Sequence, residues 1–230
     1  MNNTYFVTGT DTDAGKTVAA ATLVRALELA TRREVHYWKP VQTGDDSDSA
    51  TVTDLAGLPR HRIQRPAIEL PLPASPHEAA ADAGRALDPR PVWDGLGGLR
   101  RVLAPDPLVV ELAGGLLVPY TDPAPGAPPV TQLDWLAEER APIALVARSG
   151  LGTLNHTMLS LAALRARHLV PRVLVLVGEH HASNLATLAA WGEVPVLELP
   201  RLEPLDPGTV DAIARQWAVG APELLESLLA

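Results

Sequence analysis

Three consecutive residues, Gly15, Lys16 and Thr17, have the types that bind a nucleoside triphosphate. Such a site combines backbone N–H groups and a helix N-terminus aimed at phosphate, a lysine for the β- and γ-phosphate oxygens, and a hydroxyl for Mg²⁺. The usual spacing is G-x-x-x-x-G-K-[ST], but Thr10 occupies the place of its first glycine, and Gly9 stands one residue early. We expect the phosphates of a nucleotide to bind along this loop, at Gly9, Asp13, Ala14, Gly15, Lys16, Thr17 and Val18, and a plain strand–helix turn is the alternative.

Two carboxylates lie inside the same loop, at Asp11 and Asp13, where they would repel the phosphates that the loop attracts. They therefore need another partner, which a hydrated Mg²⁺ ion or a cationic substrate amine would provide. Solvated aspartates that stabilise the turn are the alternative. In the branch of such ATPases that acts as dimerising switches, a signature lysine lies four residues before the second loop glycine, and that position here is Asp11.

The elements that must position these residues follow from the alternation of apolar runs and amphipathic stretches. A β-prone run at 5–8 ends at Gly9, and an apolar helical face begins near Lys16, so the loop joins a strand to a helix. Continuous apolar strands separated by helices are typical of a mostly parallel sheet covered on both faces. The prediction is an α/β fold of a single domain over residues 1–230. Further strands are expected at 35–38, 107–110, 143–147, 173–177 and 194–197, and further helices at 49–57, 92–103, 131–139, 154–167, 182–191 and 207–229.

The composition excludes several kinds of chemistry. Of the 230 residues 47% are apolar, and the net charge is −8, which argues against a surface for nucleic acid or anionic membrane, because both need clustered cations. Cysteine is absent, so disulfides, thiolate nucleophiles and cysteine-ligated metals are excluded. No apolar run approaches the roughly 20 residues that span a bilayer, and no secretion signal precedes the first strand. We therefore expect a cytoplasmic protein.

Five motifs, in this order along the chain, resemble those of the dethiobiotin synthetase family. They are GTDTDAGKT at 9–17, YWKPVQTG at 37–44, SPH at 75–77, VELAGG at 110–115 and GLGTLNH at 150–156. The resemblance covers residues 4–200 and implies a P-loop NTPase-like ligase. The implied reaction joins 7,8-diaminononanoate to CO₂ or bicarbonate with cleavage of ATP to ADP and phosphate. One amine forms a carbamate, the carbamate takes the γ-phosphoryl group, and the second amine closes the cyclic urea.

The resemblance implies roles for residues around the phosphate loop. Lys16, Lys39 and Thr12 would be catalytic, with Lys39 beside the carbamate and the transferring phosphoryl group. Thr17, Asp48 and Glu111 would bind Mg²⁺, and Glu111 follows a buried strand, where a metal ligand of an open α/β sheet is expected. The alternative for Asp48 is a helix N-cap, with Asp45 or Asp46 taking the metal.

The diamine and its distant carboxylate are expected at further positions. By the same resemblance, Asp13 joins the diamine side of the loop. The carboxylate would meet the N-terminus of the 154–167 helix, whose free N–H groups favour an anion, from across the interface of a homodimer. An ordinary helix cap is the alternative there. The substrate-binding residues implied are Thr12, Lys39, Thr43, Gly114, Gly152, Thr153 and Asn155.

Two positions depart from the family pattern. Leu112 stands where glycine usually follows the metal-binding glutamate, and we expect it to crowd the backbone near Gly114. Gly178 stands where family members commonly have an asparagine that reads the adenine edge. The nucleotide base would then be contacted by the backbone at Gly178 and by Pro200, Leu202 and Glu203, and we expect relaxed base preference.

Two other functions compete with the ligase. A partition-type switch that dimerises on ATP is disfavoured by Asp11 at the signature-lysine position and by the lack of a membrane-targeting amphipathic tail. A related amidoligase would need an ammonia source, usually a glutaminase domain with a cysteine nucleophile, and this chain has no cysteine.

Overall fold

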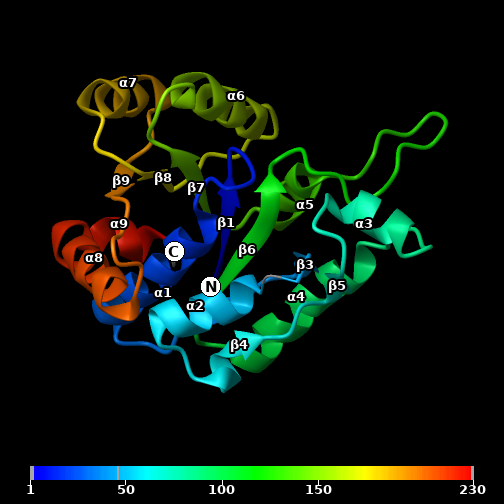
Figure 1. The fold of residues 1–230 in the computed structure, drawn as a ribbon, viewed down its shortest axis with the longest axis horizontal. Coiled ribbons are helices and arrows are strands. Elements are labelled where there is room, and N and C mark those ends of the chain that lie inside the picture. The colour runs from blue at the N-terminus through cyan, green and yellow to red at the C-terminus, as the bar shows by residue number, and fades with distance from the viewer. Residues whose placement is uncertain (1–2, 46, 229–230) are drawn as a thin grey trace.

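The computed structural model describes residues 3–45 and 47–228, which contain a seven-stranded sheet whose neighbouring strands all pair in parallel (Figure 1). The central strands are continuous apolar runs because helices cover both faces of the sheet. The strands, in their order across the sheet, are β4 (Ile63–Gln64), β2 (His36–Trp38), β6 (Leu108–Gly115), β1 (Thr4–Gly9), β7 (Ile143–Arg148), β8 (Val173–Val177) and β9 (Val196–Leu199).

The helices form two layers, each with its own apolar cluster against the sheet. On one face, the buried cluster contains side chains of α1 (Lys16–Thr31), α2 (Asp48–Ala56), α8 (Pro207–Gly220) and α9 (Pro222–Ser227). The other face is covered by α3 (Pro76–Asp82), α4 (Arg90–Leu103), α5 (Gln132–Glu139), α6 (Thr153–Ala166) and α7 (Ala182–Gly192). The predicted α/β fold, with a mostly parallel sheet and helices on both faces, is confirmed. That residues 1–230 form a single domain stays a prediction.

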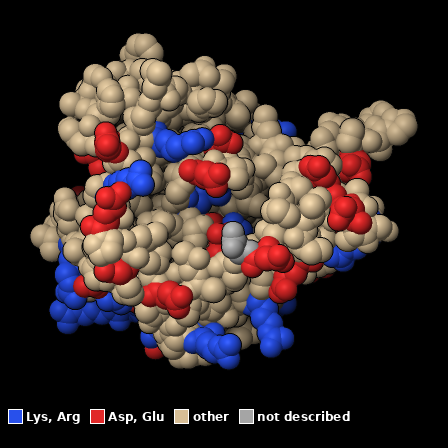
Figure 2. Space-filling model, viewed as in Figure 1, with Lys and Arg blue, Asp and Glu red and all other residues tan. Residues whose placement is uncertain are grey.

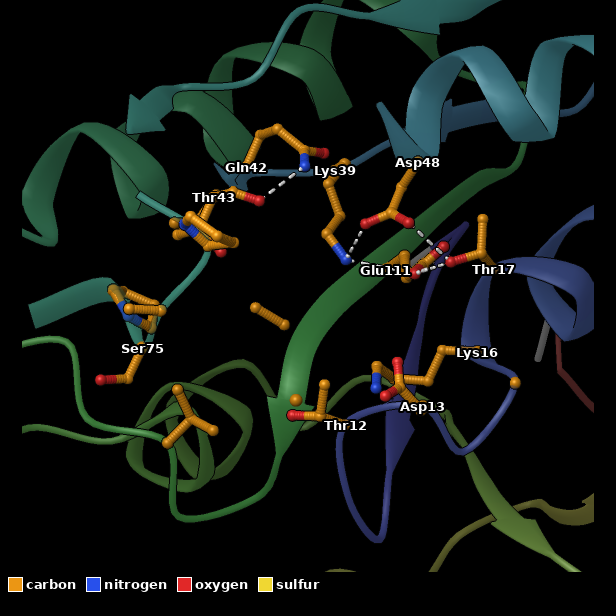
Figure 3. A pocket seen from close by; sticks show the side chains of 18 of the residues that line it. Thr12, Asp13, Lys16, Thr17, Lys39, Gln42, Thr43, Asp48, Ser75 and Glu111 are labelled. Carbon is orange, nitrogen blue, oxygen red and sulfur yellow. Dashed lines mark hydrogen bonds and ion pairs between the residues drawn. The ribbon is translucent and has the colours of Figure 1, made fainter. Parts of the chain in front are cut away.

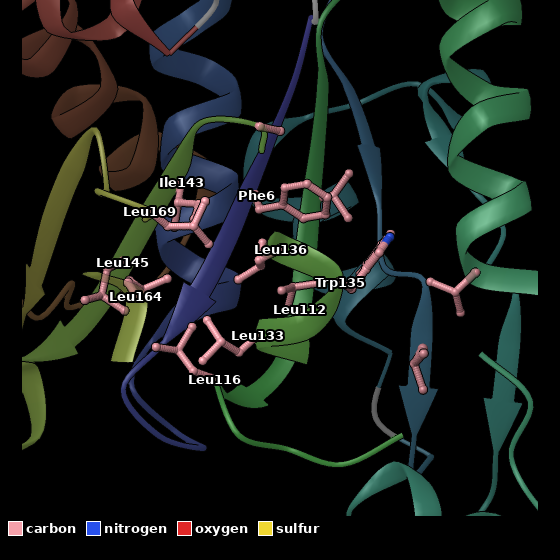
Figure 4. Close-up of a cluster of buried hydrophobic side chains, with 14 of the residues drawn as sticks. Phe6, Leu112, Leu116, Leu133, Trp135, Leu136, Ile143, Leu145, Leu164 and Leu169 are labelled. Carbon is pink, nitrogen blue, oxygen red and sulfur yellow. The ribbon is translucent and has the colours of Figure 1, made fainter. Parts of the chain in front are cut away.

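The second cluster is built around an aromatic contact between the sheet and α5 (Figure 4). Trp135 packs edge-on against Phe6 of β1, with ring centroids 5.0 Å apart, and against Trp38 of β2 at 6.5 Å. Leu112 of β6 belongs to this cluster and has no exposed surface. Its side chain therefore points away from the face that carries Glu111, as alternation along a strand requires. The expected crowding by Leu112 is wrong, because the side chain lies in the core.

Several elements were absent from the sequence prediction. β3 (Val41–Thr43) and β5 (Ile68–Leu70) form a separate parallel pair, and β4 has only two residues, so their patterns were too short to recognise. A single 3₁₀ turn at Arg60–Arg62 precedes β4. The helix predicted at 207–229 is two helices, because the chain leaves helical geometry at Ala221 and restarts at Pro222, which has no N–H to donate.

Two proline-rich segments form loops beside the sheet. The 71–75 segment is irregular and ends where α3 begins at Pro76, and the 119–131 segment projects from the body of the molecule between β6 and α5 (Figure 1). The glycine-rich 95–98 run lies inside α4. Within the described ranges, no helix is long and apolar enough to cross a membrane.

Candidate active site

The phosphate loop connects the end of β1 to the start of α1, and its glycines permit close approaches. A Cβ at Gly9 would lie 2.9 Å from the carbonyl oxygen of Asp11 and 3.1 Å from Cδ of Lys16. Gly15, the residue before α1, has φ +90°, and a Cβ there would lie 2.8 Å from Val177. Both positions therefore require glycine, and they let the chain fold tightly around the Lys16 side chain. The glycine that stands one residue early is thus explained by contact with the lysine.

A cavity of about 640 Å³ opens beside this loop, and both lysines of the chain line it (Figure 3). Lys16 donates from Nζ to the carbonyl oxygen of Asp11 at 2.9 Å and is 7% exposed. Burial lowers the pKa of Lys16, and the neighbouring Lys39 ammonium lowers it further. Apart from these two lysines, all Lys or Arg residues of the chain are arginines. Lysine is thus used only where a compact ammonium faces this cavity.

Three oxygen-bearing side chains converge at the cavity floor from α1, α2 and β6 (Figure 3). Oγ1 of Thr17 lies 2.8 Å from Oδ1 of Asp48 and 2.9 Å from Oε1 of Glu111. A hydroxyl and two carboxylates are the hard oxygen donors that Mg²⁺ prefers, so the donor set fits that ion. Acidic and basic atoms also gather at the central hollow of the surface view (Figure 2).

Asp48 is free to serve this cluster because another residue caps its helix. Oγ of Ser47 accepts the Ala50 N–H at 3.1 Å, so Ser47 is the N-cap and the alternative that placed Asp48 there is wrong. Asp45 is exposed and does not line the cavity, and Asp46 lies outside the described residues. The metal-binding role of Asp48 stays a prediction.

Lys39 supplies the positive charge that the two carboxylates need. Its Nζ lies 2.8 Å from Oδ2 of Asp48 and 3.1 Å from Oε1 of Glu111, and its side chain is almost fully buried. Burial alone would lower the pKa of Lys39, but the two carboxylates outweigh it and the pKa is raised. Burial likewise favours neutral Asp48, yet Lys39 brings the pKa of Asp48 below its ordinary value. Lys39 and Asp48 are therefore both charged at neutral pH.

The same cavity is also lined by the residues expected to face the diamine. Thr12, Asp13, Thr43 and Gly114 line it, together with the 73–76 segment, of which the motif at 75–77 had marked only the last two residues. Gly114 has φ +61°, and a Cβ there would lie 2.8 Å from Val118. This backbone requires glycine, so a side chain at 114 would displace the loop that closes this side of the cavity.

A second cavity, of about 550 Å³, lies beside the carboxyl ends of β7 and β8. Gly152, Thr153 and Gly178 line it, so the structure separates them from the cavity of the lysines. Asn155 is exposed and lines neither cavity. Three residues expected near the base, Pro200, Leu202 and Glu203, also line neither, although Arg201 between them lines the second.

Two contacts escaped sequence reasoning. The Asp11 carboxylate pairs with Arg148 at 3.1 Å, so a cation of the same chain is its partner. The Tyr37 hydroxyl donates to Oε2 of Glu111 at 2.8 Å. Tyr37 lies two residues before Lys39, so alternation along the strand could have placed both side chains on the same face of the sheet. Nothing in the sequence marks Arg148 as the partner of Asp11.

Comparison with known proteins identifies the family. Residues 3–209 match the model of an AAA domain family. An ATP-dependent dethiobiotin synthetase of Rhodopseudomonas palustris strain BisB5 is 42% identical over 95% of this chain and 94% of its own length, and one of Agrobacterium fabrum is 43% identical over 90% of each. A solved ParA family ATPase of Chlorobium tepidum covers 94% of this chain and 97% of its own, with a TM-score of 0.56 at 12% identity, which shows the fold alone.

These relatives match the chain over nearly its whole length. The likeness to the ParA family ATPase extends only to the arrangement of the sheet and helices. The chain belongs to the family of ATP-dependent dethiobiotin synthetases, which are ligases.

Proposed function

We propose that this protein uses Mg²⁺ and ATP to carboxylate 7,8-diaminononanoate with CO₂ and to close the ring, giving dethiobiotin, ADP and phosphate. One observation carries the assignment. The only two lysines of the chain share one cavity, beside the phosphate loop, with the oxygen atoms of Thr17, Asp48 and Glu111. Anions are made twice in this reaction, as a carbamate and as a transferring phosphoryl group, and both need concentrated positive charge.

The nucleotide end is assigned to the loop and the first turn of α1. The N–H groups of the loop and the Lys16 ammonium would hold the phosphates, with Lys16 directed there by its bond to the loop backbone. Bound by Thr17, Asp48 and Glu111, a Mg²⁺ ion would neutralise phosphate charge and align the γ-phosphoryl group. The backbone of Gly178 and the 200–203 segment would contact the base of the nucleotide.

The chemical steps are assigned to the side of the cavity around Lys39. An amine nitrogen of the substrate attacks CO₂, loses a proton and becomes a carbamate, whose negative charge Lys39 stabilises. A carbamate oxygen then takes the γ-phosphoryl group, and ADP leaves. The second amine attacks the carbamoyl carbon, loses a proton, expels phosphate and closes the cyclic urea. Thr12 and Asp13 would orient the diamine, with the Asp13 carboxylate facing its positive charge, and Thr43 and Gly114 would complete this side.

The carboxylate end of the substrate is assigned to a second copy of the chain. Gly152, Thr153 and Asn155 do not line the cavity of the lysines in their own chain, so we propose that they complete it in a partner, as a homodimer. Two apolar side chains of the same segment, Leu151 and Leu159, are 106% and 61% exposed. An interface that buries them would remove this apolar surface from water. The predicted cytoplasmic location stays a prediction.

The decisive experiment supplies diaminononanoate, bicarbonate, Mg²⁺ and ATP and identifies the product by mass spectrometry. A diamine-dependent cyclic urea, with one ADP formed per product, supports the proposal. Lys16→Ala and Lys39→Ala should each abolish or severely slow its formation. Arg90→Ala is the control, because this exposed side chain pairs with Asp88 and lines neither cavity. Normal turnover by Lys39→Ala would refute the role assigned to that ammonium.

A further inference from the structure

The two oxygens of Glu111 have separate sets of neighbours. Oε1 lies 2.9 Å from Oγ1 of Thr17 and 3.1 Å from Nζ of Lys39, on the side that faces the cavity. Oε2 accepts a hydrogen bond from the hydroxyl of Tyr37 at 2.8 Å. Glu111 and Tyr37 have no exposed surface, so water does not reach this bond.

The sheet brings Tyr37 to the glutamate. β2 and β6 are parallel neighbours, with Tyr37 opposite Val109. Glu111 lies two residues further along β6 and so projects from the same face as Val109. A tyrosine is long enough to lean along the strand and place its hydroxyl beside the next carboxylate on that face. Trp38, the next residue of β2, enters the opposite apolar cluster.

We propose that Tyr37 is a positioning residue, which holds the Glu111 carboxylate in the rotation that presents Oε1 to the metal of the nucleotide complex. This inference rests on the proposed metal binding by Glu111. The last torsion of a glutamate is broad and has no strong preference of its own, so an oriented carboxylate needs a partner that fixes it. Partners that orient metal ligands contribute strongly to metal affinity.

The other two tyrosines show that the bond is not a general consequence of burial. Tyr5 and Tyr120 are also fully buried, and among the described residues neither hydroxyl has a hydrogen-bond partner. A buried tyrosine of this chain thus tolerates an unpaired hydroxyl. Tyr37 alone of the three donates to a residue of the proposed metal site. Tyr5→Phe is therefore the matched control for Tyr37→Phe.

The test compares the dissociation constants of ADP and of Mn·ADP, measured by calorimetry on the full chain. Their ratio reports what the metal adds to nucleotide binding. Tyr37→Phe should reduce the ratio about tenfold while leaving the constant for ADP alone unchanged, and Tyr5→Phe should leave both unchanged. In a Glu111→Gln background, Tyr37→Phe should have no further effect, because it acts through the carboxylate.

The outcomes separate this inference from the proposed function. A wild-type ratio of one would refute metal binding at this site and the inference with it. The inference alone would be refuted if the wild-type ratio exceeds one and Tyr37→Phe leaves it unchanged. It would also be refuted if Tyr5→Phe lowers the ratio as much as Tyr37→Phe does.

If Tyr37→Phe does not fold, the wild-type sequence labelled with 3-fluorotyrosine still tests the inference. Its three resonances would be assigned from Tyr5→Phe and Tyr120→Phe. The Tyr37 resonance should shift with Mg·ADP and not with ADP alone, and no shift would overturn the inference.

Discussion

Replacing Lys39 by methionine removes one ammonium from a buried cluster and keeps most of the side-chain volume. Nζ of Lys39 lies 2.8 Å from Asp48 and 3.1 Å from Glu111. A pair of unit charges about 3 Å apart gains about 5 kcal/mol at an effective dielectric constant of about 20, and desolvation offsets part of that. Removing one partner of a buried pair costs about 3–5 kcal/mol. Because the Asp48 side chain is 31% exposed, we expect a loss near 3 kcal/mol.

The pH range of this effect follows from the direction of the shift. The pKa of Lys39 is raised in the folded protein, since the carboxylates of Glu111 and Asp48 outweigh the opposing effect of burial. Its contribution to stability is therefore complete below the unfolded pKa of about 10.4, and it is lost only as pH rises through the higher folded value. At pH 7 the full difference between wild type and Lys39→Met should be present.

Lys16→Met is the matched control, because Lys16 and Lys39 are the only lysines and face the same cavity. Burial and the Lys39 charge lower the pKa of Lys16, so the folded state disfavours its charged form. Losing that charge should therefore cost less stability than losing Lys39. Both variants should nevertheless lose turnover, because both ammoniums are assigned to anions of the reaction.

Urea unfolding at pH 7 with a chelator measures the free energy of unfolding of the three proteins. Repeating it with Mg²⁺ should stabilise Lys39→Met more than wild type, because the ion replaces the missing positive charge beside the carboxylates. Wild-type stability in Lys39→Met, or an equal loss in Lys16→Met, would refute the reasoning.

Three further predictions address the base, a helix cap and the loop. With Gly178 offering no side chain to the base, kcat/KM for ATP should exceed those for GTP and CTP by less than about a hundredfold, or roughly 2.7 kcal/mol, in steady-state assays. Asp134→Asn should cost about 1 kcal/mol of unfolding free energy at pH 7. Bonds from Thr131 and Arg167 outweigh burial and lower the pKa of Asp134, so the loss should shrink as pH falls through that depressed value in acid urea titrations. Gly9→Ala should lower kcat/KM for ATP by up to about a hundredfold while the far-ultraviolet circular dichroism stays unchanged, because its Cβ would meet loop backbone.

The local sequence was sufficient to predict those features whose residues are neighbours in the chain. The phosphate loop was predicted because its backbone, lysine and hydroxyl are neighbours in the chain, and the apolar strands because their patterns are continuous. Short elements such as β3 and β5 carry too few residues for a pattern. The role of Asp48 was left open between metal ligand and N-cap of α2, because aspartate is a good N-cap residue. Only the structure shows that Ser47 accepts the Ala50 N–H instead.

The sequence by itself determined the α/β class and the nucleotide loop, since periodicity and neighbouring residue types are local properties. It placed Glu111 at the end of its strand, whereas β6 continues past Glu111 to Gly115. Only the tertiary structure decided that Tyr37 holds Glu111, that Lys39 joins it to Asp48, and that Arg148 pairs with Asp11. These contacts depend on the order of strands across the sheet, with β6 between β2 and β1, and β7 on the other side of β1. Strand order is set by how all the apolar faces pack at once, so charges distant in the chain meet only when the whole core forms.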